Sequence, residues 1–412
     1  MTDSPSAKPL GPIPAGFESR NGELVIGGRT ASDLAAGGTP CFAYSRAMID
    51  ARMAALRAAM PGRLHIHYAI KANPFAPLLA LMAELADGLD IASAGELAMV
   101  RAAGADLARV SFAGPGKRDA ELETAIAAGV TVNVESEGEA RRALRIAEKL
   151  GVTPRLAIRV NPDFDLKGSG MKMGGGARPF GVDADRAAAL AREVIATGCA
   201  WRGFHIFAGS QALDAEAVIA TQGATLDLAD RLARELDVPL PGLNMGGGFG
   251  IPYFPGDAPL DIARVGAALA ERFGRLPDSL EDAEIAIELG RYLVGEAGVY
   301  LTRIVDRKES RGETFLVTDG GLHHQLAASG NFGAVVRRNY PLAIASRFDA
   351  PPEEVANVVG CLCTPLDRLA DRPALPRADV GDLVAVFCAG AYGATASPAA
   401  FLGHGPATEM LV

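Results

Sequence analysis

The sequence predicts an α/β fold in which a (β/α)8 barrel is followed by an all-β domain. The first observation is a rhythm of eight short apolar runs, separated by alanine-rich stretches, between residues 65 and 288. The early intervals are each roughly 20 to 25 residues, the length of one β-α unit. The second observation is that β-like runs and turn residues replace this rhythm from residue 295 onward. A doubly wound open sheet would show a similar rhythm with fewer strands, so the count of eight favours the barrel.

The elements follow in order along the chain. The expected barrel strands are 65–69, 88–92, 110–113, 131–134, 155–160, 203–207, 243–246 and 284–288, with helices over 77–86, 94–103, 119–128 and 137–150. The expected strands of the β domain are 299–305, 315–318, 356–359 and 383–387. We therefore expect three segments: 1–40, which joins the β domain through a strand at 23–26; 41–294, the barrel; and 295–412, the β domain.

Composition excludes several classes of function. The 412 residues carry a net charge of −9 and no basic run, which argues against nucleic acid as a partner. No apolar stretch approaches the roughly 18 residues of a membrane span, and the N-terminus lacks the features of a signal peptide. The five cysteines are scattered and odd in number, which favours reduced thiols and a cytoplasmic location. The six histidines are spread out, so no metal site is expected.

Lys71 ends the first barrel run and is followed by a turn. Strand positions 67, 69 and 71 share one face, and a lysine on an inward face must be paired or lose its charge. A desolvated lysine amine is a nucleophile that can form a Schiff base with an aldehyde cofactor. The alternative is a strand-end lysine that simply reaches solvent.

Further candidate residues follow later strands. Gly246, Gly247 and Gly248 would let backbone N–H groups approach a phosphate, although a tight turn is the alternative. Glu288 and Arg291 follow the eighth strand, where the acid could hold a proton on a ring nitrogen and the arginine could bind a phosphate; a strand-end ion pair is the alternative.

Two other segments contain candidate functional residues. His205 and Phe207 share one face of the sixth strand, where both could contact a flat cofactor, although an isolated histidine there is more often a core residue. The glycine-rich, cationic stretch 167–178 follows the fifth strand, and it is either a lid over the catalytic face or a flexible surface insertion.

Together these motifs resemble the fold-type III pyridoxal-phosphate decarboxylases, which include diaminopimelate, ornithine and arginine/lysine decarboxylases. The resemblance covers roughly residues 40 to 405 and rests on motifs that occur in the family's order. These motifs are 68–73, 90–96, 246–248, 288–291, 360–367 and 390–392. Each motif alone is weak, but six in order are a strong signal.

The resemblance implies pyridoxal 5'-phosphate as cofactor and a homodimer with active sites at the subunit interface. Lys71 would form the Schiff base with the cofactor, Glu288 would keep the pyridine nitrogen protonated, and Cys363 of the partner subunit would protonate Cα. The implied cofactor-binding residues are Lys71, Asp90, His205, Phe207, Ser210, Gly246, Gly247, Gly248, Glu288, Gly290, Arg291 and Tyr392. The implied substrate-binding residues are Asp319, Thr364 and Asp367.

Three departures from the family pattern bear on the substrate. Phe207 stands where relatives usually have a histidine that stacks on the ring. Thr364 stands where diamino-acid decarboxylases have an acid, and a hydroxyl cannot offset the desolvation of an ammonium. No arginine follows Asp319 within 320–325, unlike the diaminopimelate enzymes. We therefore expect a substrate without a free distal ammonium, such as a carrier-tethered aminoacyl group that Lys167, Lys172 and Arg178 could help to dock.

The sequence also allows three alternative functions. Diaminopimelate or another diamino acid is one alternative substrate. A racemase shares the barrel and β domain, but racemases place an arginine at the pyridine nitrogen where this chain has Glu288. A non-catalytic cofactor carrier would lack the long β domain and the Cys363 segment, and both are present.

Overall fold

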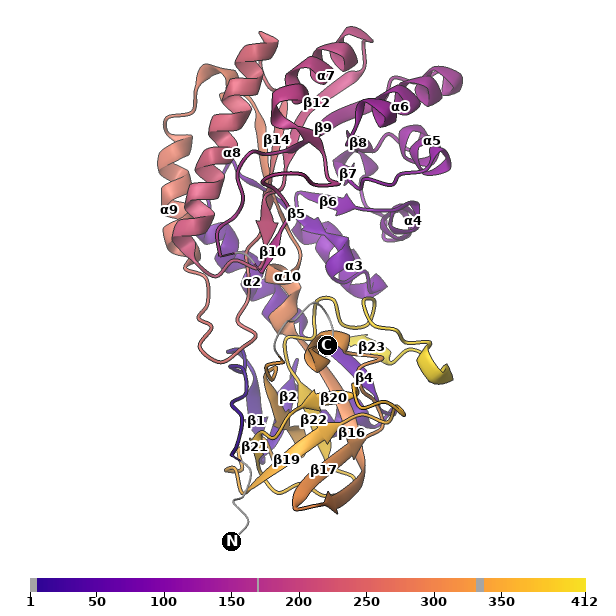
Figure 1. The fold of residues 1–412 in the computed structure, drawn as a ribbon, viewed down its shortest axis with the longest axis vertical. Helices are drawn as coiled ribbons and strands as arrows, with labels where there is room; N and C mark the ends of the chain where they lie inside the picture. Colours follow the sequence, from indigo (N-terminus) through magenta and orange to yellow (C-terminus); the bar gives the residue numbers. More distant parts are fainter. Residues whose placement is uncertain (1–5, 169, 331–336) are drawn as a thin grey trace. The chain divides into compact units, whose positions relative to one another are not determined.

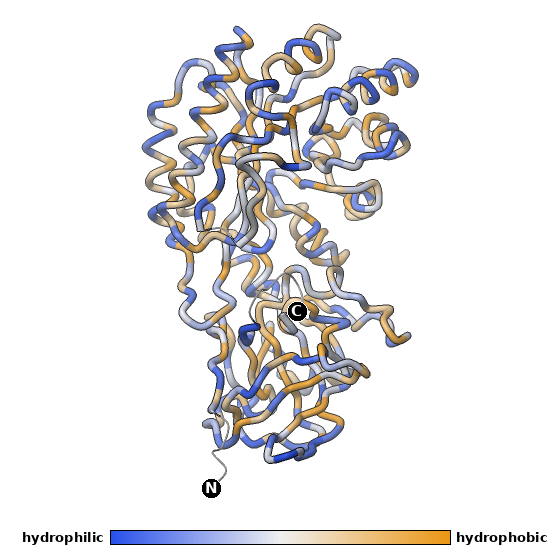
Figure 2. Tube along the Cα trace, in the orientation of Figure 1, coloured by the Kyte–Doolittle hydropathy of each residue, from blue (hydrophilic) through white to orange (hydrophobic). Residues whose placement is uncertain are grey.

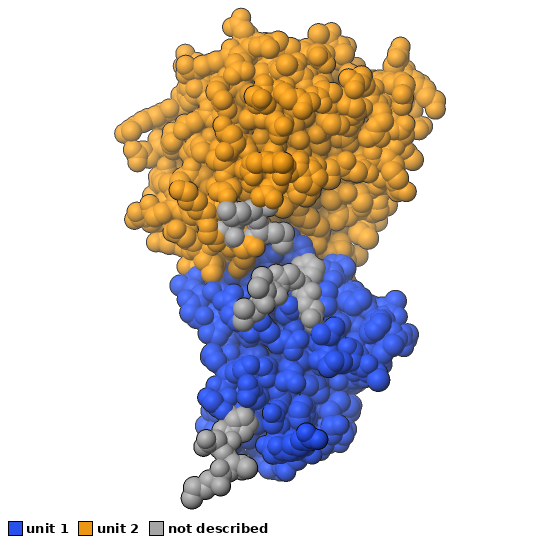
Figure 3. All heavy atoms as spheres, in the orientation of Figure 1, with its two compact units in different colours: residues 1–52, 251–258, 291–412 blue, residues 53–250, 259–290 orange. Residues whose placement is uncertain are grey.

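The computed structural model describes residues 6–168, 170–330 and 337–412. The chain divides into two compact units, which Figure 3 shows in separate colours. The barrel unit comprises residues 53–250 and 259–290, and the β unit comprises residues 1–52, 251–258 and 291–412. Both units are therefore assembled from segments that are distant in the sequence.

The core of the barrel unit is a closed parallel barrel. Its strands are β5 (His65–Ala69), β6 (Gly88–Ile91), β7 (Val110–Phe112), β8 (Thr131–Val134), β9 (Arg155–Asn161), β12 (Ala200–Ile206), β14 (Gly242–Gly247) and β15 (Glu284–Leu289). The barrel closes because β15 pairs with β5 and β8 pairs with β9. The sequence prediction of eight parallel strands is confirmed. The carboxyl ends of the strands meet at one rim, where barrel enzymes place their active sites.

Helices follow the strands and lie around the barrel (Figure 1). They are α3 (Ala76–Leu85), α4 (Ala94–Ala102), α5 (Asp119–Ala127), α6 (Glu137–Leu150), α7 (Ala184–Ala196), α8 (Ala215–Leu236) and α9 (Ile262–Phe273). α6 illustrates the local causes: the Ser136 hydroxyl accepts from the Glu139 N–H at its start, and Gly151 ends it in the left-handed conformation. Hydrophilic and hydrophobic positions alternate along these helices (Figure 2), as expected when one face packs on a barrel.

The β unit is built around the long strand β16 (Gly298–Ser310). It pairs with β4 (Cys41–Tyr44), β17 (Glu313–Thr318) and β22 (Leu383–Val386). The sheet continues through β18 (Leu342–Ile344), β19 (Glu354–Val359), β20 (Arg368–Ala370), β21 (Ala374–Leu375) and β23 (Thr408–Leu411). All four strands expected here from the sequence are present.

The N-terminal segment contributes to the β unit in a different way from the one expected. The expected strand at 23–26 is β2 (Glu23–Ile26), and among the described strands its partners are β1 (Glu18–Arg20) and β3 (Arg29–Thr30), in a separate sheet. Leu24 and Ile26 still pack in one core with Leu383 and Phe387. The strand that extends the large sheet is β4, because its apolar residues 41–44 are all buried between β16 and β23. None of the helices in the described ranges is both long and apolar enough to cross a bilayer.

Candidate active site

Lys71 lies at the carboxyl rim of the barrel, two residues after the end of β5. The strand ends at Ala69, and Lys71 sits in a 3-10 turn (Ile70–Ala72) rather than in the strand itself. Its Nζ is 3.8 Å from the Glu288 Oε1 and 5.8 Å from the centre of the Phe207 ring. The side chain is 48% exposed, so of the two expected outcomes, pairing or desolvation, the chain by itself shows pairing with a carboxylate. The turn projects the amine into the barrel mouth, where a ligand can cover it.

Glu288 is buried next to the end of β15, close to Lys71. The His205 Nε2 is 2.9 Å from the Glu288 Oε2. Burial alone would raise the pKa of Glu288, but the hydrogen bond from His205 and the charges of His205 and Lys71 outweigh it and lower that pKa to about 2. The carboxylate is therefore ionised throughout the neutral range. His205 thus holds this carboxylate in place, and its expected contact with the ring of a cofactor stays a prediction.

These residues line one hollow of about 170 Å³ inside the barrel mouth. Its walls include Lys71, Asp90, Arg159, His205, Phe207 and Glu288. A nucleophilic amine, a buried carboxylate and an aromatic face thus meet in a space of the size of a small planar ring. The structure brings together five of the residues named from the sequence as catalytic or cofactor-binding: Lys71, Asp90, His205, Phe207 and Glu288.

His67 supports Asp90 at the side of this hollow. The His67 Nδ1 is 3.3 Å from the Asp90 Oδ2. Burial disfavours the charged imidazole, but the Asp90 carboxylate more than offsets this and raises the pKa of His67. A Cβ at Gly88 would lie 2.7 Å from the His67 Nε2, so glycine is needed beside this ring. Sequence reasoning did not assign His67 a role, although its face, shared with residue 71, was the available signal.

Arg159 was also missed from the sequence. It lies on β9, where its Nη1 donates to the Glu135 Oε1 at 3.0 Å and its guanidinium lies 5.0 Å from the Phe180 ring centre. The Glu135 carboxylate also accepts from the Gly181 N–H at 3.1 Å. The ion pair with Glu135 fixes the Arg159 guanidinium in the wall of the hollow, where its positive charge helps to lower the pKa of Glu288. A charged residue inside an otherwise apolar strand was the signal in the sequence.

The glycines at the end of β14 allow three strand ends to approach one another. A Cβ at Gly246 would lie 2.7 Å from the Ile206 carbonyl oxygen, and one at Gly247 would lie 1.9 Å from that of Glu288. The Gly246 N–H donates to the Asn244 Oδ1 at 2.8 Å, so the turn itself uses one of the expected phosphate donors. The phosphate-binding role of Gly247 and Gly248 stays a prediction.

Two further cofactor positions lie beside these turns. A Cβ at Gly290 would come 2.8 Å from the Ala72 Cβ, so this glycine lets the end of β15 pack on the turn that carries Lys71. Ser210 belongs to β13 (Gly209–Ser210), which pairs with β10 (Met171–Lys172) inside the glycine-rich stretch 167–178. That stretch is therefore tied to the barrel rim by a short sheet, while Ser169 lies outside the described residues. Whether the stretch acts as a lid stays a prediction.

Within the β unit, Arg291 sits among aromatic rings. It begins α10 (Arg291–Val294), and its Nη1 donates to the Tyr253 hydroxyl at 2.9 Å. Its guanidinium carbon lies 4.8 Å from the centre of the Tyr392 ring, and Tyr392 adopts a positive φ of 55°. Burial raises the pKa of Tyr253 to about 12, so this phenol stays neutral. Tyr253 was not identified from the sequence, because nothing in its local pattern marks it.

The segment 360–367 of the β unit carries the remaining candidates. Asp367 is 3% exposed and accepts from the Leu362 N–H at 2.8 Å and the Leu322 N–H at 2.7 Å. Asp319 accepts from the Thr302 hydroxyl at 2.7 Å and the Arg303 N–H at 2.9 Å. Direct substrate contacts by these two carboxylates stay predictions, because the chain itself engages both. Cys363 is exposed, and Thr364 follows it in the same turn.

Comparisons with known proteins agree with this geometry. A family model described as "Pyridoxal-dependent decarboxylase, pyridoxal binding domain" matches residues 46–295. The L-glutamyl-[BtrI acyl-carrier protein] decarboxylase of Niallia circulans is 36% identical over 90% of this chain and 88% of its own length. The diaminopimelate decarboxylase of Archaeoglobus fulgidus is 34% identical over 96% of this chain and 93% of its own length. The crystal structure of a Helicobacter pylori diaminopimelate decarboxylase with L-lysine has a TM-score of 0.78 at 28% identity, over 91% of each chain.

Proposed function

Because the chain belongs to the pyridoxal-dependent decarboxylase family, we propose that it removes the α-carboxylate of an amino acid or aminoacyl group that lacks a free distal ammonium. Family membership itself identifies the chain as a pyridoxal-phosphate-dependent amino-acid decarboxylase. The proposal adds the substrate class, the residue roles and a homodimer with shared active sites. The observation that carries the substrate class is the neutral Thr364 beside Cys363.

The barrel mouth fits pyridoxal phosphate on three counts. The hollow is lined by a lysine amine for the aldehyde, an ionised carboxylate for the pyridine nitrogen and an aromatic face for the ring. Bound pyridoxal phosphate supplies an aldehyde that links covalently to amines and a protonated ring that accepts the electrons of the broken bond. Gly247, Gly248, Ser210, Arg291 and Tyr392 are the residues we propose to hold the phosphate.

Glu288 has the central electrostatic role in this proposal. Its pKa is lowered to about 2, so it remains ionised and can keep a proton on the ring nitrogen. His205 fixes the carboxylate through the 2.9 Å hydrogen bond and compensates its buried charge. Racemases on this fold place an arginine at the same point, so Glu288 favours decarboxylation over racemisation.

Lys71 and Cys363 have the two remaining chemical roles. Lys71 holds the cofactor before the substrate amine replaces it, and its half-exposed position leaves it accessible to that amine. Phe207 and Phe180 present apolar surface to the hollow, which would disfavour a substrate carboxylate and favour its loss as carbon dioxide. The partner subunit's Cys363 then delivers a proton to Cα.

The substrate class follows from the chemistry of Thr364. A buried ammonium needs a carboxylate partner, and a hydroxyl offers only a dipole. The relative from Niallia circulans is named for a glutamyl group on an acyl-carrier protein, and it likewise needs no partner for a distal ammonium. We propose a carrier-tethered acidic aminoacyl group as the preferred form, docked near the cationic stretch 167–178.

Carbon dioxide release tests this substrate class. The cofactor-loaded protein is assayed with free diaminopimelate, lysine, ornithine and arginine, and with an L-glutamyl carrier conjugate. We expect release from the conjugate alone. Release from any of the four free diamino acids would overturn the proposal and favour an ordinary diamino-acid decarboxylase. The visible absorbance of the lysine-bound cofactor must be present, so that a negative result cannot reflect missing cofactor.

A substitution sharpens the test. Thr364→Glu restores an acid and should raise kcat/KM for a free diamino acid by about tenfold or more, because hydrogen bonds to charged groups contribute about 1.5–3 kcal/mol. Thr364→Gln is the matched control, since it has the same length without the charge. An equal gain in both variants would contradict the role of charge.

The shared site has a separate test. Lys71→Ala and Cys363→Ala are each expected to inactivate a homodimer. Mixing the two inactive proteins under conditions of subunit exchange should restore part of the activity, because one site of each mixed dimer then has both native residues. No recovery, with mixed dimers demonstrated by mass spectrometry, would place both residues in the same subunit's site.

A further inference from the structure

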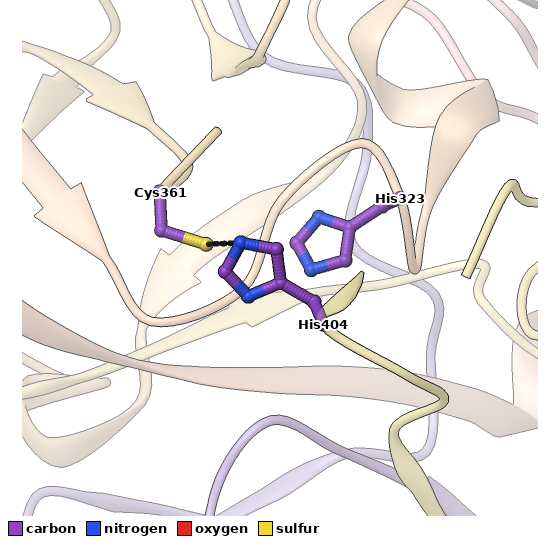
Figure 4. A group of neighbouring side chains, drawn as sticks. All are labelled: His323, Cys361 and His404. Atoms are coloured by element: carbon purple, nitrogen blue, oxygen red, sulfur yellow. Dashed lines mark hydrogen bonds between the residues drawn. The ribbon is translucent and has the colours of Figure 1, made fainter. Parts of the chain in front are cut away.

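A cluster of potential metal ligands lies in the β unit, and none of its three members has a role in the proposed function. His323, Cys361 and His404 approach one another so that their ligand atoms all lie within 4.8 Å (Figure 4). The Cys361 Sγ is 4.0 Å from the His404 Nε2, and the rings of His323 and His404 are 4.8 Å apart. These residues are far apart in the sequence, so no motif with metal-ligand spacing predicts the cluster.

His323 is the observation that points to a ligand. Its side chain is fully buried, and neither ring nitrogen has a hydrogen-bond partner among the described residues. A buried polar group without a partner is costly and rare.

The Cys361 thiol and the His404 side chain complete the candidate ligand set. The Cys361 Sγ lies 3.5 Å from the Asp319 carbonyl oxygen, a weak hydrogen bond that holds the thiol beside the two imidazoles. A divalent ion would ionise this thiol on binding. His404 is exposed, so one side of the cluster is open to an incoming ion.

We propose that His323, Cys361 and His404 form a zinc-binding site with a fourth position for water. Two imidazoles and one thiolate suit Zn²⁺, which holds its ligand atoms at about 2.0–2.3 Å and thus about 3.5 Å from one another. Rotation of the exposed His404 side chain would close the present gap. The ion would join the loop after β17 to the segment 360–367, which also carries Cys363.

Cobalt titration tests this site in the full-length, untagged, cofactor-loaded protein. After treatment with a chelator, Co²⁺ should bind with one equivalent and give a near-ultraviolet thiolate-to-metal absorption that Zn²⁺ abolishes. Cys361→Ser should remove this absorption. His404→Gln should weaken Zn²⁺ binding at least about tenfold, the lower limit for losing even an outer-shell partner.

The matched control is Cys363→Ser, because this thiol lies in the same turn but outside the cluster. It should retain the absorption and the stoichiometry. Absence of stoichiometric binding by the native protein would overturn the site. So would equal binding by Cys361→Ser, or loss of the absorption in Cys363→Ser alone. Circular dichroism checks that each variant folds, and the exposed position of His404 keeps that variant informative if Cys361→Ser does not.

Discussion

Glu288 of the barrel unit and Asp367 of the β unit are both buried carboxylates, but their partners differ in kind. Glu288 in the barrel faces side chains: the His205 imidazole at 2.9 Å and the Lys71 amine at 3.8 Å. Asp367 in the β unit faces backbone N–H groups of Leu322 and Leu362. Side-chain partners can exchange protons or yield to a ligand, whereas backbone donors are fixed in place.

This difference suggests a division between chemistry and support. Glu288 and Lys71 have side-chain partners at the proposed cofactor site, so their substitution should change activity more than stability. Asp367 ties the loop at 320–322 to the segment at 360–367, so its substitution should change stability first. The predictions below test that division, beginning with the largest expected effect.

Lys71→Ala should abolish decarboxylation. The variant lacks the amine that we propose to hold the cofactor, and the visible absorbance of the lysine-bound cofactor should disappear with the activity. Because Lys71 is half exposed, the fold should survive, as circular dichroism would show. Lys149→Ala, at the exposed end of α6, is the matched control and should retain full activity. Substantial turnover by Lys71→Ala would remove the central role of the barrel mouth.

Glu288→Gln should lower kcat/KM by about 10²–10⁴-fold, the range for a positioned proton-transfer group. The amide cannot keep a proton on the ring nitrogen, although it can still bond to His205. Steady-state kinetics on the loaded enzyme measures the effect. Glu284→Gln, on the same strand but exposed, should leave kcat/KM within a factor of two or so of the native value. Similar losses in both variants would indicate damage to β15 instead.

Asp367→Ala should lower the local unfolding free energy of the β unit by about 1–3 kcal/mol, because two buried N–H groups lose their acceptor. Amide hydrogen exchange of residues 320–322 and 360–367 should accelerate by about 5- to 150-fold. Asp306→Ala, exposed on β16, should change exchange little. Unchanged exchange in Asp367→Ala, with a loss of activity, would move this residue from support to chemistry.

The sequence predicted the barrel well because its signal is local and repeated. Each strand and helix can be recognised by the periodicity of its apolar residues and by the turn residues beside it, and eight repeats reinforce the prediction. The role of β4 was not predicted, because the apolar run 41–44 reads equally well as a strand of either domain. Only its pairing with β16 and β23 assigns it to the β unit.

The candidate site was predicted in part for a similar reason. Lys71, Glu288 and the glycines stand at strand ends, where position alone suggests a role. His67, Arg159 and Tyr253 act through partners that are distant in the sequence, and no spacing reveals such pairs. The structure also shows that His205 bonds to Glu288. The position of His205 on the same face as Phe207 did not indicate this partner.

The smallest predicted effect concerns His67 and its dependence on pH. The pKa of His67 is raised in the folded chain by Asp90, so the ion pair stabilises the fold fully below the unfolded value of 6.5. This contribution is lost as the pH rises through the raised folded pKa. His67→Gln should therefore lower the free energy of unfolding by on the order of 1 kcal/mol at pH 6, and by less at pH 9. Urea denaturation of the cofactor-free protein, followed by the fluorescence of Trp201, measures both values. A difference between native and variant proteins that grows with pH would reverse the sign and show that His67 is neutral beside Asp90. The barrel mouth would then hold one fewer charged pair, and the contrast with the β unit would rest on Glu288 alone.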